Sequence, residues 1–165
     1  MSRVLTVGVF DLVHFGHFEL FRKCKALAGP GGELIVGVQD DEHVKKYKPH
    51  VKLVYPYEVR RSLVSDLRMV DRVIRHTDVD ETVKSVDFDV FCVGGDQGHD
   101  GFCRALAWCE ANGKEVVRIP RTKGISSTLL REDADALCRN LLSQFFDIDP
   151  DRIMDALRGG RQGEM

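Results

Sequence analysis

The sequence has 165 residues, of which 43% are hydrophobic, and a formal net charge of −2. This length is typical of one domain with a substantial core, and the small net charge excludes a general nucleic-acid or membrane-surface binder. No apolar run is as long as a membrane span, and Met1-Ser2-Arg3 leads into a strand pattern rather than a signal peptide. We therefore expect a cytoplasmic protein with no membrane span and no nucleic-acid partner.

Short β-branched runs alternate with helical patterns along the chain, which is typical of a parallel sheet with crossover helices. The predicted strands are Val4–Val9, Leu34–Val38, Arg72–Arg75, Val90–Gly94 and Glu115–Ile119. The predicted helices cover residues 17–28, 57–68, 79–86 and 100–112. These elements predict an α/β fold with a Rossmann-like, doubly wound, parallel five-stranded sheet. In such sheets, ligands bind outside the carboxyl ends of the strands.

The end of the chain has a different pattern. Residues 133–146 have helical periodicity, Asp149-Pro150 can start another short helix, and the last residues from Gly159 have a composition typical of a frayed tail. We predict a main domain of residues 1–132 and a C-terminal helical extension of residues 133–165. The extension is too short to be a second catalytic domain.

The segment from Gly8 to His17, with the sequence G-V-F-D-L-V-H-F-G-H, joins the first strand to a helical pattern that begins at Phe18. A helix start presents unpaired N–H groups and partial positive charge, so imidazoles there face any anion that binds. We expect His14 and His17 to contact phosphate. A structural role in the loop is the alternative, and two histidines without a third ligand make a poor zinc site.

Other familiar sites are absent from the sequence. The five cysteines are an odd number without a C-x-x-C pair, which predicts buried reduced thiols rather than a disulfide framework or a zinc site. There is no Walker-type loop, and no G-x-G-x-x-G follows the first strand, which argues against a dinucleotide oxidoreductase. We predict no metal held by protein ligands alone.

A second motif, R-T-K-G-I-S-S-T at Arg121–Thr128, follows the last predicted strand. Its three hydroxyl residues precede a helical run that we expect to start at Leu129. This arrangement predicts a second anion-binding helix start. A plain N-cap would explain one of the hydroxyl groups.

Together, the two segments resemble the signature motifs of the cytidylyltransferase family, G-x-F-D-x-x-H-x-G-H and R-T-x-G-I-S-T-T. Ser127 is the departure in the second motif, and Val9 stands where many members of the family carry Thr. The match spans roughly residues 4 to 132. The resemblance implies transfer of a cytidylyl group from CTP to a phosphorylated small alcohol, which gives a CDP-alcohol and pyrophosphate.

The resemblance also implies roles for individual residues. The catalytic residues would be His14, His17, Lys48 and Arg121. The nucleotide would be bound by Gly8, Val9, Phe10, His14, His17, Gly94, Asp96, Arg121, Thr122, Gly124, Ile125, Ser126, Ser127 and Thr128. The acceptor would be bound by Asp11, Asp41, Lys46, Lys48 and Arg68. Asp11 would orient the loop or the acceptor rather than act as a base, because an ionised acceptor phosphate has no proton to lose.

Several of these assignments have structural alternatives. The run from Lys45 to Lys48, which we expect in a loop, is also typical of a solvated face, and the choice between Lys45 and Lys46 stays open. Arg60 and Arg68 lie eight apart in one predicted helix, where Arg60 could equally be solvated. Asp96 could instead cap the following helix. The resemblance implies a homodimer that uses residues 68–73.

The expected ligands are CTP, a phosphorylated acceptor and Mg²⁺, the last bound mainly through the nucleotide phosphates. Glycerol 3-phosphate is the first acceptor to consider, and phosphocholine, phosphoethanolamine, a sugar or polyol phosphate, or a phosphonate are alternatives. An adenylyltransferase that uses ATP is the alternative enzyme, although the second motif favours CTP. A catalytically silent binding module on the same fold is a further alternative, which the retained histidines, Arg121 and lysines disfavour.

Overall fold

The computed structural model describes residues 1–95, 97–145, 149 and 151. The chain divides into two compact units, Met1–Arg121 and Thr122–Met165. The predicted domain boundary at residue 132 stays a prediction, and the expected frayed tail lies outside the described residues, as does nearly all of the short helix expected from Asp149.

The first unit is built on a five-stranded sheet of order β3-β2-β1-β4-β5, in which all neighbouring strands are parallel. The strands are β1 (Arg3–Gly8), β2 (Glu33–Gln39), β3 (Arg72–His76), β4 (Val90–Gly94) and β5 (Glu115–Ile119). Val4 of β1 is in register with Leu34 of β2 and Val90 of β4. The predicted Rossmann-like fold class is confirmed, and the strand order changes direction beside β1.

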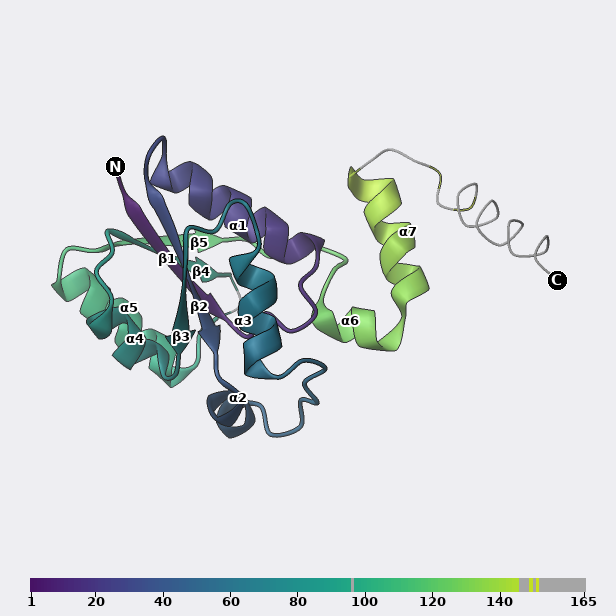
Figure 1. The fold of residues 1–165 in the computed structure, drawn as a ribbon, viewed down its shortest axis with the longest axis horizontal. Helices are drawn as coiled ribbons and strands as arrows, with labels where there is room; N and C mark the ends of the chain where they lie inside the picture. The colour runs from purple at the N-terminus through teal and green to yellow at the C-terminus, as the bar shows by residue number, and fades with distance from the viewer. Residues whose placement is uncertain (96, 146–148, 150, 152–165) are drawn as a thin grey trace. The chain divides into compact units, whose positions relative to one another are not determined.

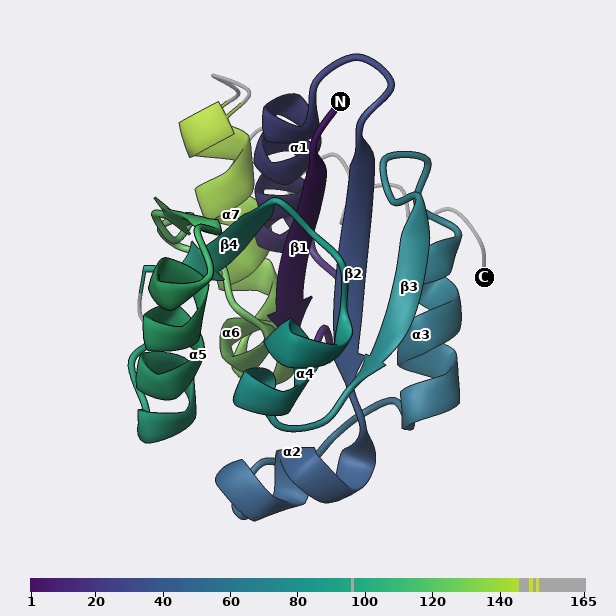
Figure 2. The same cartoon turned by 90° about the vertical axis from the view of Figure 1, so that its left-hand side faces the viewer.

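Helices cover both faces of this sheet, as the two ribbon views show (Figures 1 and 2). One face carries α1 (Phe15–Ala28) and α3 (Tyr57–Ser65), and the other carries α4 (Val79–Ser85) and α5 (Asp100–Ala111). A further short helix, α2 (Asp41–Tyr47), follows the carboxyl end of β2. The carboxyl ends of β1, β2 and β3 therefore lie at the edge of the sheet that carries α2 (Figure 2).

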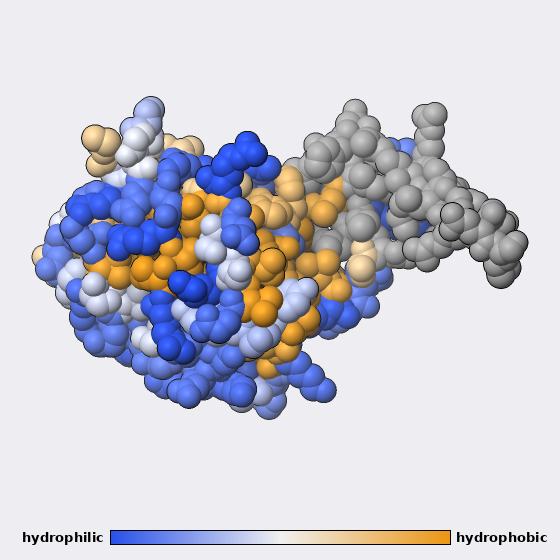
Figure 3. Space-filling model, in the orientation of Figure 1, coloured by the Kyte–Doolittle hydropathy of each residue, from blue (hydrophilic) through white to orange (hydrophobic). Residues whose placement is uncertain are grey.

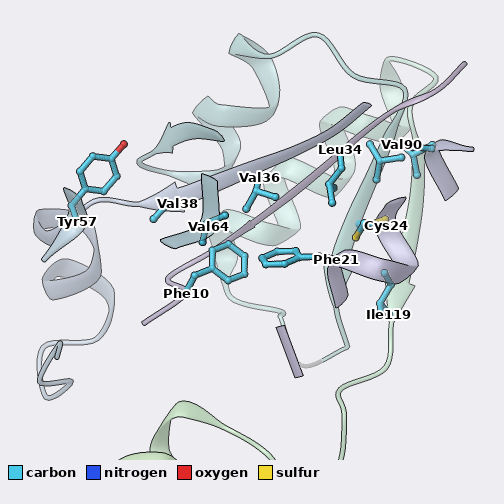
Figure 4. Packing of buried hydrophobic residues seen from close by; sticks show 13 residues of the cluster. Phe10, Phe21, Cys24, Leu34, Val36, Val38, Tyr57, Val64, Val90 and Ile119 are labelled. Carbon is cyan, nitrogen blue, oxygen red and sulfur yellow. The ribbon is translucent and has the colours of Figure 1, made fainter. Parts of the chain in front are cut away.

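Two apolar clusters hold the helices to the sheet. In the cluster under α1 and α3, the Phe10 ring packs against the Phe21 ring with 5.1 Å between ring centroids (Figure 4). In the cluster under α4 and α5, fully buried Phe88 and Phe91 contact the helices. Phe10 belongs to the histidine motif, so the motif is anchored directly in the core.

The four cysteines whose side chains the structure describes, Cys24, Cys92, Cys103 and Cys109, form no disulfide with one another. Cys24, Cys92 and Cys109 are buried, but Cys103 is exposed, which corrects the expectation that the thiols are buried. Cys103 lies on the exposed side of α5. A single small residue in a helical pattern does not reveal which side of the helix is buried. The side chain of Cys138 lies outside the described part of the chain.

Two sequence predictions in this unit were wrong. Lys45 and Lys46 lie in α2 rather than in a loop, because Asp40 caps a seven-residue helix whose only buried residue is Val44, and Lys48 follows this helix as its C-cap. The helix expected over residues 57–68 ends at Ser65, so Arg68 is not on the same helix as Arg60. Apolar residues continue beyond Ser65 as a core-contacting loop, which extended the helical pattern in the sequence.

The second unit contains α6 (Ser127–Glu132) and α7 (Ala134–Phe145). Helix α6 begins at Ser127 rather than at Leu129, because the Ser126 hydroxyl accepts a hydrogen bond from the Leu129 N–H at 3.1 Å and so caps the helix. None of the helices in the described residues is long and apolar enough to cross a membrane.

Candidate active site

His14 and His17 form the start of α1. The Nδ1 atom of His14, the N-cap, accepts a hydrogen bond from the Gly16 N–H at 3.1 Å, and the Nδ1 atom of His17 accepts one from the His14 N–H at 3.4 Å. The two rings are stacked, with 3.9 Å between their centroids and an interplanar angle of 20°. The histidines therefore replace the side chains of an ordinary capping box.

These hydrogen bonds also fix the proton positions. Because each Nδ1 is an acceptor, the neutral ring must carry its proton on Nε2. Burial and the charge of Arg121 lower the pKa of His14 to about 4. Burial, then His14 and Arg121, lower the pKa of His17 to about 3, against a weaker opposing effect of Asp11. At neutral pH, both residues are uncharged hydrogen-bond donors.

The loop before the histidines has a constrained backbone. Phe10 and Leu12 have φ values of 53° and 52°, a left-handed conformation that is unfavourable for residues with a side chain. Gly8 is required beside them, because a Cβ atom there would lie 2.8 Å from the Phe10 ring. The loop is thus held in one conformation that directs the chain into α1.

Asp11 holds this loop against the segment before α3. Its buried carboxylate accepts hydrogen bonds from the N–H groups of Val54 and Tyr55 at 3.0 and 3.1 Å. This geometry accounts for Asp11 as a residue that orients the loop, which is one of the two roles expected for it.

Arg60 is fully buried and connects three parts of the site. Its guanidinium donates to the carbonyl oxygen of Val9 at 2.5 Å and that of Tyr55 at 3.1 Å, and it contacts the Asp41 carboxylate at 2.6 Å. Arg60 is therefore neither a solvated nor a substrate-facing residue. Asp41 also accepts from the Tyr57 N–H at 3.2 Å, so both of its oxygens bind the protein.

The lysines after β2 differ in their surroundings. Lys46 contacts the Asp78 carboxylate at 3.2 Å, and the same carboxylate accepts a hydrogen bond from the Tyr47 hydroxyl. Lys48, the C-cap residue directly after α2, lines a pocket at the carboxyl ends of the strands. Of the two lysines expected to bind the acceptor, the structure thus places Lys48 at a cavity and Lys46 in an ion pair.

This pocket has a volume of about 440 Å³ and lies entirely within the first unit. Its lining residues come from the ends of β1, β2 and β3, the end of α2, the start of α4, the segment between β4 and α5, and the start of α5: Val7, Gly8, Val9, Gln39, Tyr47, Lys48, His76, Val79, Gln97, Gly98, His99 and Phe102. The pocket therefore adjoins the histidine motif through Gly8 and Val9. Its size is typical of sites for small molecules.

The structure does not bring every predicted residue to this region. Arg68 is exposed and precedes β3, so it lies at the amino-terminal edge of the sheet, opposite the strand ends that carry the pocket. The neighbouring Asp71 binds Lys25 at 2.5 Å and the Leu34 N–H at 2.6 Å. Within one chain, Asp71 thus connects this segment to β2 and α1, and acceptor binding by Arg68 stays a prediction.

Gly94 ends β4, and its N–H donates to the Oε1 atom of Gln97 at 3.0 Å. Asp96 lies outside the described residues. Thr122, Gly124, Ile125, Ser126, Ser127 and Thr128 belong to the second unit, and their contacts with a nucleotide stay a prediction.

Sequence reasoning missed six polar or aromatic residues of the pocket: Gln39, Tyr47, His76, Gln97, His99 and Phe102. A signal was present for two of them, because Gln39 and His76 are polar residues directly after predicted strands. His99 stacks on Tyr47, with 5.4 Å between centroids, across a sequence separation that no periodicity reveals.

The fold and the two histidines define a class of protein, the nucleotidyltransferases with a Rossmann-like sheet. The family model described as cytidylyltransferase-like matches residues 5–133, and the chain belongs to this family. It is an enzyme of the nucleotidyltransferase class.

Relatives with different names are similar to the chain. It is 34% identical to the glycerol-3-phosphate cytidylyltransferase of Staphylococcus aureus, over 81% of this chain and 95% of that protein. It is 35% identical to the FAD synthase of Korarchaeum cryptofilum, over 82% of this chain and 94% of that protein. The solved structure of a lipopolysaccharide core biosynthesis protein from Thermoplasma volcanium is 30% identical, with a TM-score of 0.60, and covers 74% of this chain and 98% of that one.

Proposed function

We propose that the protein transfers a cytidylyl group from CTP to a phosphorylated small alcohol and releases pyrophosphate. The observation that carries this proposal is the pair of stacked, neutral histidines whose Nε2–H groups are left to donate at the start of α1. The relatives make glycerol 3-phosphate the first acceptor to test.

In this reaction, an oxygen of the acceptor phosphate attacks the α-phosphorus of CTP. A new P–O bond forms as the bond between the α-phosphorus and the bridging oxygen breaks, and its electron pair leaves with pyrophosphate. No proton needs to be removed from an ionised acceptor. The chemical task is therefore to hold two anions in line and to stabilise charge on the nonbridging oxygens.

His14 and His17 suit this task because Nδ1 of each ring accepts a backbone hydrogen bond, which leaves the proton on Nε2 to be donated. Their Nε2–H groups would donate to the α-phosphate as its charge increases, from a backbone that is already fixed by the capping hydrogen bonds. Arg121, which acts electrostatically on both rings, would hold the departing phosphates. Lys48 would neutralise the acceptor phosphate at the mouth of the pocket.

Magnesium would reach the site with the nucleotide. Among the described residues, no group of three or more His, Cys, Asp or Glu side chains could hold a metal ion. A Mg²⁺ ion that is held by phosphate oxygens and water would add positive charge at the leaving group.

Adenylyl transfer from ATP is the second candidate, and the similarity to FAD synthases favours it. The test is a comparison of pyrophosphate release from CTP and from ATP, at saturating Mg²⁺, with glycerol 3-phosphate and FMN as acceptors and mass spectrometry of the products. We expect the catalytic efficiency with CTP to exceed that with ATP at least tenfold. An ATP preference would overturn cytidylyl transfer and support the second candidate.

We also propose a homodimer. Apolar side chains gather on the face that carries α1 and α3 (Figure 3), and Val59 and Leu63, four apart on α3, are 39% and 41% exposed. Residues 68–73 follow this helix. Light scattering should report twice the monomer mass at micromolar concentration, and a monomer would overturn the idea.

A further inference from the structure

The pocket at the strand ends has an unusual chemistry for a site next to phosphate groups. Its described lining contains one cation, Lys48, and no carboxylate, whereas several neutral polar side chains come from four different elements. Neutral side chains of this kind are suited to hydrogen bonds with uncharged polar groups of a ligand.

His76 contributes a hydrogen-bond acceptor to this pocket. Its side chain is 3% exposed, and its Nδ1 atom lies 2.9 Å from the Thr82 hydroxyl. That hydroxyl uses its single proton to donate to the carbonyl oxygen of Asp78 at 2.9 Å, so it must accept from Nδ1–H of His76. The Nε2 atom of His76 is left with a lone pair, and the described part of the chain supplies no partner for it.

His99 and Gln97 contribute donors. The Nδ1 atom of His99 accepts from the Gly101 N–H at 3.2 Å, which leaves Nε2–H of the neutral ring to donate. The Oε1 atom of Gln97 accepts from the Gly94 N–H, which leaves the amide NH₂ group. Gln39 has the opposite arrangement, because its NH₂ group donates to the Thr77 carbonyl at 3.1 Å and its oxygen is left to accept.

Uncharged acceptors and donors thus line one pocket. A hydroxyl group both donates and accepts a hydrogen bond, so a chain of hydroxyl groups can satisfy all four residues. We propose that this pocket binds the hydroxyl-bearing chain of the acceptor, and that the preferred acceptor is a phosphorylated polyol or sugar longer than glycerol 3-phosphate. The inference rests on the proposed function and names the substrate class for the same site.

The size of the pocket supports a longer acceptor. At about 30 Å³ for each carbon or oxygen atom, the share of one water molecule in the liquid, a glycerol moiety would fill less than half of the 440 Å³. A chain of five or six carbons, each with a hydroxyl group, fits better. Gly8, Val9 and Lys48 line the same pocket, which puts the phosphate end of such a chain beside the histidine motif.

The arrangement of the aromatic rings disfavours a flavin. The Tyr47 and His99 rings stack on each other with 5.4 Å between centroids, which is less than the about 7 Å needed to insert another ring at van der Waals distance from both. The Phe102 ring packs edge-on to His99, at 4.9 Å. These rings bind one another rather than forming an open slot.

The test measures kcat and KM of the full chain with CTP and four acceptors: glycerol 3-phosphate, ribitol 5-phosphate, glucose 1-phosphate and FMN. We expect kcat/KM to be at least tenfold higher with ribitol 5-phosphate or glucose 1-phosphate than with the other two. His76→Leu and His99→Phe should each lower kcat/KM about tenfold for the preferred acceptor, through KM, because a hydroxyl loses its partner. The effect on glycerol 3-phosphate should be below threefold.

His50→Leu, at an exposed position outside the pocket, is the matched control and should leave all values within twofold. His99→Phe keeps the ring on the surface of the protein, so it remains informative if His76→Leu does not fold. Preference for glycerol 3-phosphate or FMN, or equal effects of the variants on all acceptors, would overturn the inference but leave nucleotidyl transfer intact. Absence of pyrophosphate release with every acceptor would instead overturn the proposed function.

Discussion

The histidines at the start of α1 and the histidine at the end of β3 have the same charge and opposite hydrogen-bonding properties. In His14 and His17, the Nδ1 atom accepts from a backbone N–H, so Nε2 carries the proton. In His76, the Nδ1 atom donates to a hydroxyl oxygen, so Nε2 carries a lone pair. The same residue type therefore supplies donors where phosphate charge is expected and an acceptor where hydroxyl groups are expected.

The partner of one ring nitrogen therefore decides whether the other nitrogen donates or accepts a hydrogen bond. A helix start has surplus N–H groups, which impose the Nε2–H tautomer on a capping histidine. A threonine whose proton is used within α4 imposes the opposite tautomer.

The largest effect should follow removal of a donor at the start of α1. We expect His14→Ala or His17→Ala to lower kcat at least about a hundredfold, because each removes one hydrogen bond that strengthens in the transition state. Circular dichroism should show a folded protein, and His50→Ala is the control. Turnover near the wild-type value in either folded variant would remove that histidine from the mechanism.

The second prediction concerns the stability of the protein in acid. Burial is the largest cause that lowers the pKa of His76 to about 4. His43 and His99 also lower this pKa, whereas Asp78 and Asp40 raise it. The unfolded chain takes up a proton near pH 6.5, whereas folded His76 does so only near pH 4, so stability is present at neutral pH and is lost as the pH falls between these values.

His76→Gln should remove this dependence. The free energy of unfolding of the wild type should fall between pH 7 and pH 4. We expect the fall in the variant to be smaller by about 3 kcal/mol. Urea unfolding at a series of pH values measures the difference, and His50→Gln is the matched control. An identical acid loss in His76→Gln and wild type would show that His76 is not held neutral.

Much of this arrangement could be predicted from the sequence, because local signals determine it. Five strands follow from β-branched runs, and the histidine motif follows from a glycine-ended strand before a helical pattern. Helix α2 could not be predicted in the same way, since Val44 is its only buried residue and its charged sequence is equally typical of a loop. The position of Arg68 was also hidden, because apolar residues after Ser65 extend the helical pattern into a loop. The role of Arg60 was hidden because it depends on contacts with Val9 and Asp41, which are distant in the sequence.

The pocket was harder to predict for a different reason. His76 and His99 lie on separate elements, and their tautomers depend on Thr82 and on the Gly101 N–H. No sequence periodicity relates these residues. The parallel sheet brings the end of β3, which carries His76, and the end of β4, which His99 follows as the N-cap of α5, to one edge and so to one cavity.

A smaller effect is expected for the lysines beside the two regions. Lys48→Ala should lower kcat/KM for the acceptor about tenfold, because an ammonium group beside a phosphate in a partly closed pocket contributes roughly this much. Lys45→Ala should change it less than twofold, and Lys46→Ala should have a small effect because Lys46 already pairs with Asp78. Equal small effects at all three positions would mean that the lysine run is only a solvated face.

The smallest change is expected in the protonation of the histidine pair between pH 8 and pH 5.5. Since the pKa values of His14 and His17 are lowered to about 4 and about 3, both rings stay neutral throughout this range in the free protein. Their ring carbon and proton chemical shifts, assigned by comparison with the His14→Ala and His17→Ala variants, should therefore stay constant in an NMR titration. A midpoint near pH 6.5 for either ring would show that it is a cation in slightly acidic solution. In that case, charge rather than a fixed Nε2–H donor would be its contribution to the site, and the contrast with His76 would no longer hold.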